Sequence, residues 1–337
     1  ILSTNDDANL YPEKLLDVTD LCEYLGKKYG GFFPSCNAYL KPDGKKWIGV
    51  PLGAAGAMMV YRQSHLKAAG FDTFPKDTDG FLKMLKALKE KGTPGGFALG
   101  NATGDGLWCN WLMWAFGGKL VDANNKVVID SPETIKALEY AKEMYATFPP
   151  GTLSWLDPNN NKAFLDGQVS VTNNGISIYY ATKTSTDEKV RALKEDVHHA
   201  SYPVGPVGTP TESHLFFNQM VMKYTKFPNA AKEFLRFMME KEQFDPWLTA
   251  AGGYIAPPLD FYTKSAVWTS DPKHTAYRDC VKNMRPAGYA GKMGYASAGA
   301  GADFIVVNMV AEAASGSKTP KEAAERAQKR AERYYKV

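Results

Sequence analysis

Short apolar segments alternate with longer amphipathic ones along the chain, and this alternation constrains the fold more than any other feature of the sequence. Lys46–Leu52 and Ala57–Tyr61 have the length and the apolar content of strands. Residues 81–88 instead carry apolar side chains at helical spacing, and Gly92 follows where a helix would end. The pattern predicts an α/β fold, and 337 residues are enough for about two domains.

Capping signals locate two more helices. Ser131 stands before a proline at the start of an amphipathic segment, and Thr319 and Glu322 have the spacing of a capping box. Further strands are predicted at Val169–Thr172 and Gln219–Lys223. Because helices connect the strands, we expect mainly parallel sheets.

The charge and the hydropathy pattern exclude several classes of function. Lys and Arg number 40 against 36 Asp and Glu, so the net charge is only +4, and the basic residues are scattered rather than clustered. This distribution lacks the basic patch of a nucleic-acid-binding protein. The most apolar run, Trp108–Phe116, is interrupted by Asn110 and is much shorter than the roughly 18 residues of a membrane span.

The cysteines and histidines indicate no metal site. The four cysteines, at positions 22, 36, 109 and 280, include no C-x-x-C pair. Cys22 and Cys36 are close enough in sequence to form a disulfide in an oxidising compartment, and two unreactive buried thiols are the alternative. His198 and His199 form the one histidine cluster, but neighbouring residues of a strand point to opposite faces, so we interpret them as a surface pair.

Motifs of catalysis and of cofactor binding are absent from the sequence. It contains no Walker A loop, no G-x-G-x-x-G after a strand, no H-E-x-x-H and no G-x-S-x-G. We therefore predict no cofactor and no metal. Carboxylates are plentiful, so a glycoside hydrolase with two acidic residues stays open as an alternative, although no feature selects a particular pair.

Aromatic side chains and amides gather in a few loops. Trp108, Trp111 and Trp114 follow one another at a spacing of three, which favours core packing for Trp111 and Trp114 and leaves Trp108 open. Residues 173–180 and 214–218 combine amides or histidine with aromatic rings. Such groups suit a sugar, whose hydroxyls bind polar side chains while its C–H face stacks on a ring.

Several segments, in order, resemble the extracellular solute-binding proteins of ABC importers, in particular the family-1, maltose-binding-protein-like sugar binders. The segment KAFLDGQVSVTNNG at residues 162–175 is similar to the "AF-x-x-G" segment of that family. The other similar segments are residues 47–52 with 60–62, 229–237, 253–257 and 313–328.

This resemblance implies a type II periplasmic-binding-protein fold with two α/β lobes, a ligand cleft between them and closure by hinge bending. It places lobe I at residues 1–53 and 219–262, lobe II at residues 58–215 and 266–337, and the hinge crossings near residues 53–58, 215–219 and 262–266. Since lobe I is then the smaller one, we also expect a strand–helix–strand unit of roughly 60 residues before Ile1.

The resemblance also suggests residues for the cleft. In lobe I these are Asn5, Asp6 and Asp7, with Tyr254 in a later turn. Ala55, in the first crossing, stands where some members of the family place an acidic ligand residue, so we expect that contact to be lost. In lobe II they are Asp105, Trp108, Gly175, Ser177 and Tyr179, and near the second crossing they are His214, Phe217 and Asn218. The last segment contributes Tyr289, Tyr295 and Asp303. Alternatives remain for three of them: Phe217 as a core residue, Tyr289 as a surface residue and Asp303 as a charge on the surface of a helix.

Ser177 and Asp303 stand where the family often has aromatic residues, so we expect a smaller or more polar ligand than a long maltodextrin. The resulting hypothesis is a periplasmic binding protein for a mono- or disaccharide, a glycoside or a polyol, without enzymatic activity. Its expected partner is the membrane permease of an ABC importer, and the protein itself is expected to be monomeric. The alternatives are the hydrolase and a binding module that presents its ligand to a chemoreceptor.

Overall fold

Two three-stranded sheets occupy the centre of the molecule in the computed structural model, which describes residues 1–102, 104 and 106–336. The first sheet has the order β1 (Leu2–Thr4), β6 (Leu215–Gln219) and β2 (Val50–Ala55). The second sheet has the order β4 (Val171–Asn174), β3 (Met58–Arg62) and β5 (Val197–Ala200). The consecutive strands β2 and β3 therefore belong to different sheets, and the chain passes from one sheet to the other between them.

All four strand pairs are antiparallel, so the expectation of mainly parallel sheets is wrong. Among the described residues, parallel pairing is limited to two isolated bridges, Asp77 with Val204 and Gly95 with Val171. The physical reason is that each strand pairs with a distant part of the chain. Strand β6 enters the first sheet between β1 and β2 and runs opposite to both, which the local order of helices and strands does not reveal.

Helices surround both sheets. The α-helices of the first half are α1 (Thr19–Lys28), α2 (Pro34–Leu40), α3 (Gln63–Ala68), α4 (Thr78–Glu90), α5 (Trp108–Ala115), α6 (Pro132–Tyr145) and α7 (Asn159–Leu165). Those of the second half are α8 (Ser177–Thr184), α9 (Glu188–Ala192), α10 (Pro228–Met239), α11 (Lys241–Ala250), α12 (Pro272–Thr275), α13 (Cys280–Asn283), α14 (Tyr295–Ala302), α15 (Ile305–Ser315) and α16 (Pro320–Ala331). Short 3-10 helices are η1 (Asp7–Leu10), η2 (Pro12–Lys14), η3 (Thr152–Ser154), η4 (Leu193–Glu195), η5 (Asp260–Lys264) and η6 (Ala266–Trp268).

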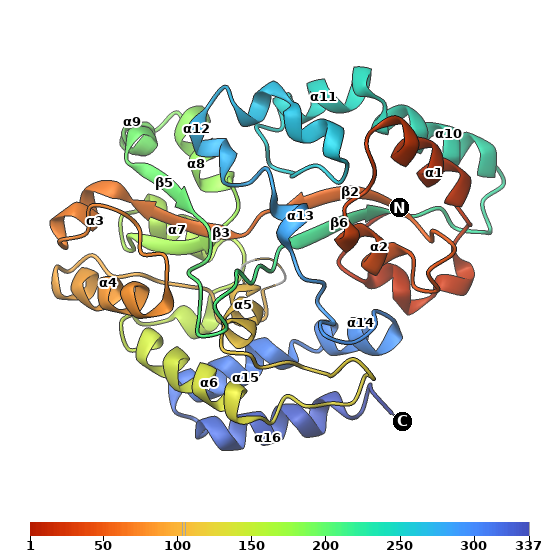
Figure 1. Cartoon of the computed structure of the whole chain (residues 1–337). Helices are drawn as coiled ribbons and strands as arrows, with labels where there is room; N and C mark the ends of the chain where they lie inside the picture. Colours follow the sequence, from red (N-terminus) through yellow and green to blue (C-terminus); the bar gives the residue numbers. More distant parts are fainter. Residues whose placement is uncertain (103, 105, 337) are drawn as a thin grey trace.

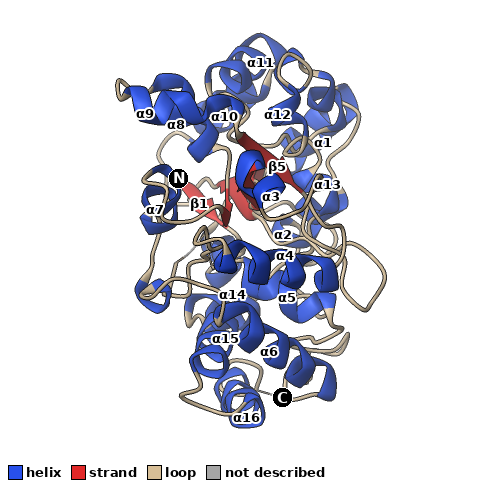
Figure 2. Cartoon of the chain, turned by 90° about the vertical axis from the view of Figure 1, so that its left-hand side faces the viewer, coloured by secondary structure: helices blue, strands red, loops and turns tan. Residues whose placement is uncertain are grey.

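The helices form two groups with the sheets between them. Helices α1, α10 and α11 lie at one end of the molecule, and α6, α15 and α16 pack together at the other (Figures 1 and 2). Within the part of the chain that the structure describes, no helix has both the length and the apolar content needed to cross a bilayer.

Strand β3 connects two hydrophobic cores because its side chains alternate between its faces. Met59 and Tyr61 belong to the core that also contains α4, α5, α6, α15 and α16. Met58 and Val60 belong to the other core, which contains α1, α2, β2 and β6. A strand that is buried on both faces has apolar residues in a continuous run, which is the sequence pattern of this segment.

The predicted helices are confirmed, with their caps. Helix α4 spans the predicted apolar stripe, and Gly92 follows it with a positive φ of 76°. Helix α6 begins after Ser131, whose hydroxyl accepts a hydrogen bond from the Thr134 N–H at 3.2 Å. Helix α16 begins after Thr319, which forms a capping box with Glu322. These ends are predictable because a cap depends on residues within one helical turn.

The strands lie less close to their predicted positions. Strand β3 begins one residue after the predicted start, whereas β2 ends at Ala55 and β4 at Asn174, in both cases beyond the predicted ends. The strand predicted at Gln219–Lys223 is wrong, because β6 ends at Gln219. In β6 the buried Phe216 and Asn218 alternate with half-buried residues, and the polar Asn218 masks that pattern in the sequence.

The three tryptophans of α5 are all buried in the core, including Trp108, for which the sequence left the choice open. The Trp108 indole N–H donates to the Ala98 carbonyl at 2.8 Å, and the Trp111 indole N–H donates to the Pro203 carbonyl at 3.0 Å. Trp108 therefore supports the fold and does not offer a stacking surface in the cleft.

Cys22 and Cys36 are free, buried thiols, as in the second of the two alternatives. They lie near different backbone carbonyls, Gly49 at 3.6 Å and Pro258 at 3.8 Å. The interpretation of His198 and His199 as a surface pair is wrong for His199, whose ring lies 4.9 Å from the ring of Tyr277 and whose Nε2 is buried.

We predict that Gly53→Ala lowers the free energy of unfolding much more than Gly44→Ala does. Both glycines have positive φ, 140° at Gly53 and 69° at Gly44. A Cβ at Gly53 would lie 2.2 Å from the Ala256 carbonyl oxygen, whereas a Cβ at Gly44 meets no atom within 4 Å. Urea unfolding should show a loss of about 3 kcal/mol or more for Gly53→Ala and about 1 kcal/mol for Gly44→Ala. Equal losses would contradict the close approach of β2 to residue 256.

Candidate functional site

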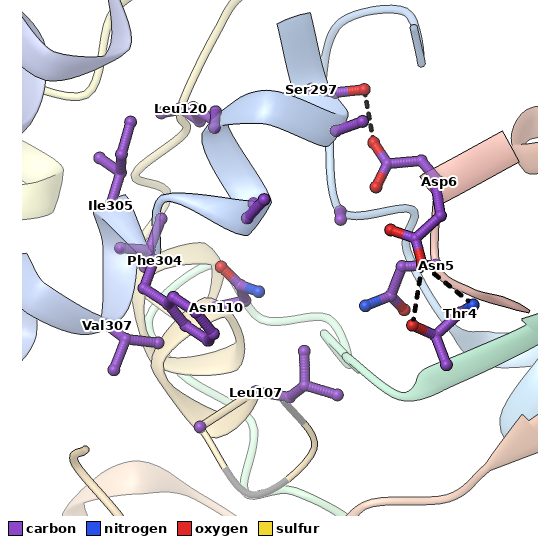
Figure 3. Close-up of a pocket in the computed structure, with 18 of the residues that line it drawn as sticks. Thr4, Asn5, Asp6, Leu107, Asn110, Leu120, Ser297, Phe304, Ile305 and Val307 are labelled. Carbon is purple, nitrogen blue, oxygen red and sulfur yellow. Dashed lines mark hydrogen bonds between the residues drawn. The ribbon is translucent and has the colours of Figure 1, made fainter. Parts of the chain in front are cut away.

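A cavity of about 350 Å³, which we call the Asp6 pocket, lies where the first residues of the chain face helices from its end. One wall is formed by residues 4–7, between β1 and η1. The opposite wall comes from α5, from α14 and from the start of α15 (Figure 3). The pocket therefore joins parts of the chain that are nearly 300 residues apart.

Strand β6 holds the first wall in shape. The Asn5 N–H donates to the Phe216 carbonyl at 2.7 Å, and the Asn5 side-chain oxygen accepts from the Phe216 N–H at 3.2 Å. The Asn218 amide donates to the Asn5 carbonyl at 3.2 Å and accepts from the Ser3 hydroxyl at 2.7 Å. Asn5 has a positive φ of 44°, a conformation that asparagine tolerates better than most residues. Asn218 is thus a buried support of the pocket wall.

Asp6 supplies a buried carboxylate. Its residue is 4% exposed, and its Oδ2 accepts a hydrogen bond from the Ser297 hydroxyl of α14 at 2.7 Å. No Lys, Arg or His among the described residues forms an ion pair with it. Burial raises the pKa of Asp6 to about 6, partly offset by the hydrogen bond from Ser297. Asp6 is therefore a strong acceptor whose charge is only partly compensated by the protein.

The opposite wall is mostly apolar. Leu107 and Phe304 lie across the cavity from Asn5 and Asp6, and the Asn110 amide lies on the same side as Leu107 and Phe304 (Figure 3). Phe304 has a positive φ of 50°, and its backbone precedes α15. A carboxylate and amides opposite an apolar surface can bind a polyhydroxylated molecule, since hydroxyls donate to the carboxylate while C–H groups contact the apolar side.

A second, smaller cavity of about 240 Å³ is lined by residues of β4, α7 and α8 together with Gly104, and we call it the Asn174 pocket. It gathers Ala55, Gly175, Ser177 and Tyr254, four of the residues suggested by the resemblance. Asn161 donates to the Ser177 hydroxyl at 3.1 Å and accepts from the Asn174 amide. The lining is rich in amides and hydroxyls, and the Tyr254 residue is 42% exposed.

Other suggested residues lie outside both pockets. Tyr179 lies on α8, as Ser177 does, but it does not line the Asn174 pocket. Its hydroxyl instead donates a hydrogen bond to Asp271 at 2.7 Å. Asp303 accepts from the Arg330 guanidinium at 2.8 Å, as expected for a charge on a helix surface. His214 is buried between two crossings: its Nδ1 accepts from the Ala57 N–H at 3.0 Å, and its Nε2 donates to Glu212 at 2.9 Å.

The remaining suggested residues are also placed. Asn5 and Asp7 line the Asp6 pocket, and Asp7 accepts from the Thr4 N–H and hydroxyl at 3.3 Å each. Phe217 is half-buried within β6, Tyr289 packs edge-to-face against Trp114, and Tyr295 is 67% exposed at the start of α14. None of these three is among the residues that line either pocket. Asp105 lies outside the described residues.

Several lining residues were not suggested by the sequence. They are Thr4, Leu107, Asn110, Ser297 and Phe304 in the Asp6 pocket, and Asp157, Asn161 and Asn174 in the Asn174 pocket. Asn174 belongs to an amide-rich segment that the sequence singled out, so part of the signal was available. Ser297 lies in a run of small residues without any distinguishing pattern. The residues that the structure describes contain no cluster of three or more His, Cys, Asp or Glu arranged to bind a metal ion.

Comparison with known proteins identifies one family. A sequence model of the family described as "Bacterial extracellular solute-binding protein" matches residues 2–276. The chain is 24% identical over 237 residues to the Escherichia coli K12 protein YcjN, described as an ABC transporter periplasmic-binding protein; the match covers 67% of this chain and 51% of YcjN. It is 23% identical over 204 residues to an ABC transporter-binding protein of Deinococcus radiodurans, covering 58% of this chain and 48% of that protein. The matched region thus spans about half the length of these curated relatives.

Solved structures of sugar-binding proteins share the fold. Maltose-bound MalE3 of T. maritima superposes with a TM-score of 0.80 at 20% identity, covering 98% of this chain and 83% of that one. A sugar transporter protein of Arthrobacter chlorophenolicus with bound laminaribiose gives 0.80 at 18% identity, covering 98% and 84%. The two-lobed type II fold is confirmed by these superpositions. The matched proteins are binding proteins and not enzymes, which argues against the hydrolase alternative.

We predict that Asp6→Asn changes the pH dependence of stability. The pKa of Asp6 is raised from 3.8 to about 6 in the folded protein, so the unfolded chain releases this proton first and stability falls as the pH rises through this range. Relative to the wild type, Asp6→Asn should therefore gain about 3 kcal/mol between pH 3.5 and pH 7, measured by urea unfolding at several pH values.

Asp43→Asn provides a control of opposite sign. The backbone N–H groups of Lys46 and Lys45 lower the pKa of Asp43, so the stabilising effect of its ionised form is present at neutral pH and is lost as the pH falls. This variant should be less stable than the wild type at pH 7, with a difference that shrinks in acid. If Asp6→Asn behaved like Asp43→Asn, Asp6 would not be a buried, uncompensated carboxylate.

Proposed function

Because the chain belongs to the bacterial extracellular solute-binding proteins, we propose that it binds a small carbohydrate or polyol between its lobes and delivers it to the permease of an ABC importer. The observation that carries this proposal is the buried carboxylate of Asp6 opposite the apolar wall at Leu107 and Phe304. Hydroxyl groups of a ligand would donate to Asp6 and to the amides, while the C–H face would contact the apolar wall.

The size of the pockets supports a mono- or disaccharide, a glycoside or a polyol. The Asp6 pocket and the Asn174 pocket measure about 350 and 240 Å³, and neither is lined by more than one aromatic ring. The fold neighbours include proteins with bound maltose, laminaribiose, α-D-tagatose and D-mannitol. A ligand with many hydroxyls and few apolar groups fits a site with few stacking surfaces.

Hinge bending would couple ligand binding to transport, because the ligand favours the closed form of the protein. We propose that lobe I comprises residues 1–53 and 219–262 and that lobe II comprises residues 58–215 and 266–337. The two separate sheets support this division, because the chain passes from one sheet to the other near these boundaries. The Ser297–Asp6 hydrogen bond joins the two lobes across the cleft. A ligand that contacts both walls binds the closed form more tightly and shifts the population toward it, and the permease would recognise that form. The protein acts in the periplasm as a monomer and carries out no reaction.

A thermal-shift panel tests the proposed function. The probes are D-mannitol, D-tagatose, maltose and laminaribiose, with amino acids and dipeptides as other solute classes. A sugar or polyol at 100 times its dissociation constant should raise the free energy of unfolding by about 2.7 kcal/mol and should be recovered unchanged. Stabilisation by amino acids or peptides alone, or consumption of the sugar, would contradict the proposal.

Two variants test whether the stabilising ligand binds in the Asp6 pocket and the Asn174 pocket. Asp6→Asn and Asn161→Ala should each weaken binding of the stabilising ligand by tenfold or more, measured by isothermal titration calorimetry, because each removes hydrogen bonds of about 1.5 to 3 kcal/mol. Asp43, an exposed residue, lines neither pocket, so Asp43→Asn serves as the control and should bind normally. Normal binding by both pocket variants would place the ligand elsewhere.

A further inference from the structure

A groove of about 630 Å³ lies between α8, η4, β5 and α12, and it shares no lining residue with the Asp6 pocket or the Asn174 pocket. We call it the α12 groove; its main residues are Tyr179, Lys183, Lys194, His199, Asp271 and Lys273. Helices α8 and α12 lie in the upper part of both overall views, whereas α14, beside the Asp6 pocket, lies lower (Figures 1 and 2). The groove is therefore separate from the cleft.

Asp271 organises one side of the groove. It accepts hydrogen bonds from the Tyr179 hydroxyl at 2.7 Å and from the Lys273 N–H at 3.0 Å. The Lys183 ammonium lies 3.6 Å from its Oδ2. Burial alone would raise the pKa of Asp271, but these hydrogen bonds and nearby positive charge hold it below its usual value. The carboxylate is thus ionised and fully engaged within the protein.

Three lysines and two carboxylates, Asp271 and Glu195, line the groove, so its net charge is +1. The Lys273 ammonium donates to the backbone carbonyls of Lys194 and, at 3.1 Å, Glu195, which are neutral acceptors. No carboxylate of the described residues forms an ion pair with Lys273. Lys194 is 4.0 Å from the carboxylate of Glu195, which is 86% exposed and therefore strongly screened by water. With Asp271 matched by Lys183, the charges of Lys194 and Lys273 remain available to attract an anion.

His199 offers an unused acceptor beside these cations. Its Nδ1 lies 2.9 Å from the Lys273 carbonyl, which can only accept, so Nδ1 carries the proton and Nε2 carries the lone pair. Nε2 is buried and has no hydrogen-bond partner within the described part of the chain. Burial lowers the pKa of His199 to about 3, so the ring is neutral at physiological pH and its Nε2 can only accept.

An apolar cavity of about 370 Å³ continues the groove along α8 and shares Tyr179, Lys183, Ser270 and His274 with it. Its walls include the rings of Tyr179 and Tyr180 and the side chain of Val267. Cations attract an anionic group, the free lone pair of His199 takes a hydroxyl hydrogen, and the apolar extension accommodates C–H groups. We propose that the α12 groove is a second small-molecule site, which binds hydroxylated organic anions of the sugar acid or sugar phosphate type.

Calorimetric titration of the full chain with D-glucuronate and D-glucose 6-phosphate tests this site and distinguishes a carboxylate from a phosphate ligand. At least one of the two should bind, and more weakly in 500 mM than in 50 mM NaCl. The double variant Lys194→Gln with Lys273→Gln removes the two lysines that Asp271 does not match, and it should weaken this binding by tenfold or more. The double variant Lys136→Gln with Lys329→Gln removes two exposed charges on α6 and α16, which do not line the groove, and should bind like the wild type.

Two further comparisons separate this site from the cleft and from simple anion binding. Asp6→Asn should leave binding of the anion unchanged. If no anion binds, the proposed sugar binding in the cleft is unaffected, and if no sugar binds, the proposed anion site is unaffected. Cyclohexanecarboxylate, which lacks hydroxyls, should bind more weakly than D-glucuronate to the wild type, and His199→Phe should reduce that difference. Three results would overturn the proposal: no binding of either anion, loss of binding in Asp6→Asn, or inorganic phosphate binding as tightly as D-glucose 6-phosphate.

Discussion

The pairing of β6 with both β1 and β2 is the constraint on which the geometry of the cleft depends. Leu2 pairs with Gln219 and Val50 pairs with the same residue from the other side, so β6 is the central strand and holds the start of the chain at the edge of this sheet. Asn218 then fixes the backbone of Asn5 through a hydrogen bond. Because backbone hydrogen bonds of a sheet are regular and directional, the position of Asp6 follows from the register of β6.

The residues just before β6 connect this constraint to the second sheet. The Nδ1 atom of His214, just before β6, accepts a hydrogen bond from the N–H of Ala57, just before β3. Ala57 is followed by β3, whose side chains alternate between the two cores. The two segments that lead into β3 and β6 are therefore joined by a hydrogen bond, and the hinge motion of the proposed function would have to move them together.

In the proposed function, the buried carboxylate of Asp6, which has no cationic partner among the described residues, is the group that favours a ligand. Burying Asp6 costs free energy, as the raised pKa of this group indicates, and Ser297 compensates only part of the cost. Hydroxyl donors from a ligand would stabilise the ionised form within the closed cleft. The same physical argument separates Asp6 from Asp271, whose donors are supplied by the protein itself.

Local features of the fold were predictable from the sequence, whereas long-range ones were not. The caps at Ser131 and Thr319 depend on residues one helical turn away, and both were found. Antiparallel pairing and the register of β6 depend on contacts across about 200 residues, and they were missed. In the site, the position of Asp6 came from a family resemblance. Tyr179 was misplaced because its face of α8 is decided by Asp271, which is 92 residues away.

Hydrogen–deuterium exchange with the sugar or polyol that stabilises the protein most would test the proposed binding mode directly. In that mode one ligand contacts both the wall of residues 4–7 and the amide-rich segment at residues 174–177. Saturating ligand should slow exchange in both segments and leave residues 272–276 of the α12 groove unchanged. Slower exchange at residues 272–276 alone, or at neither wall of the cleft, would contradict it.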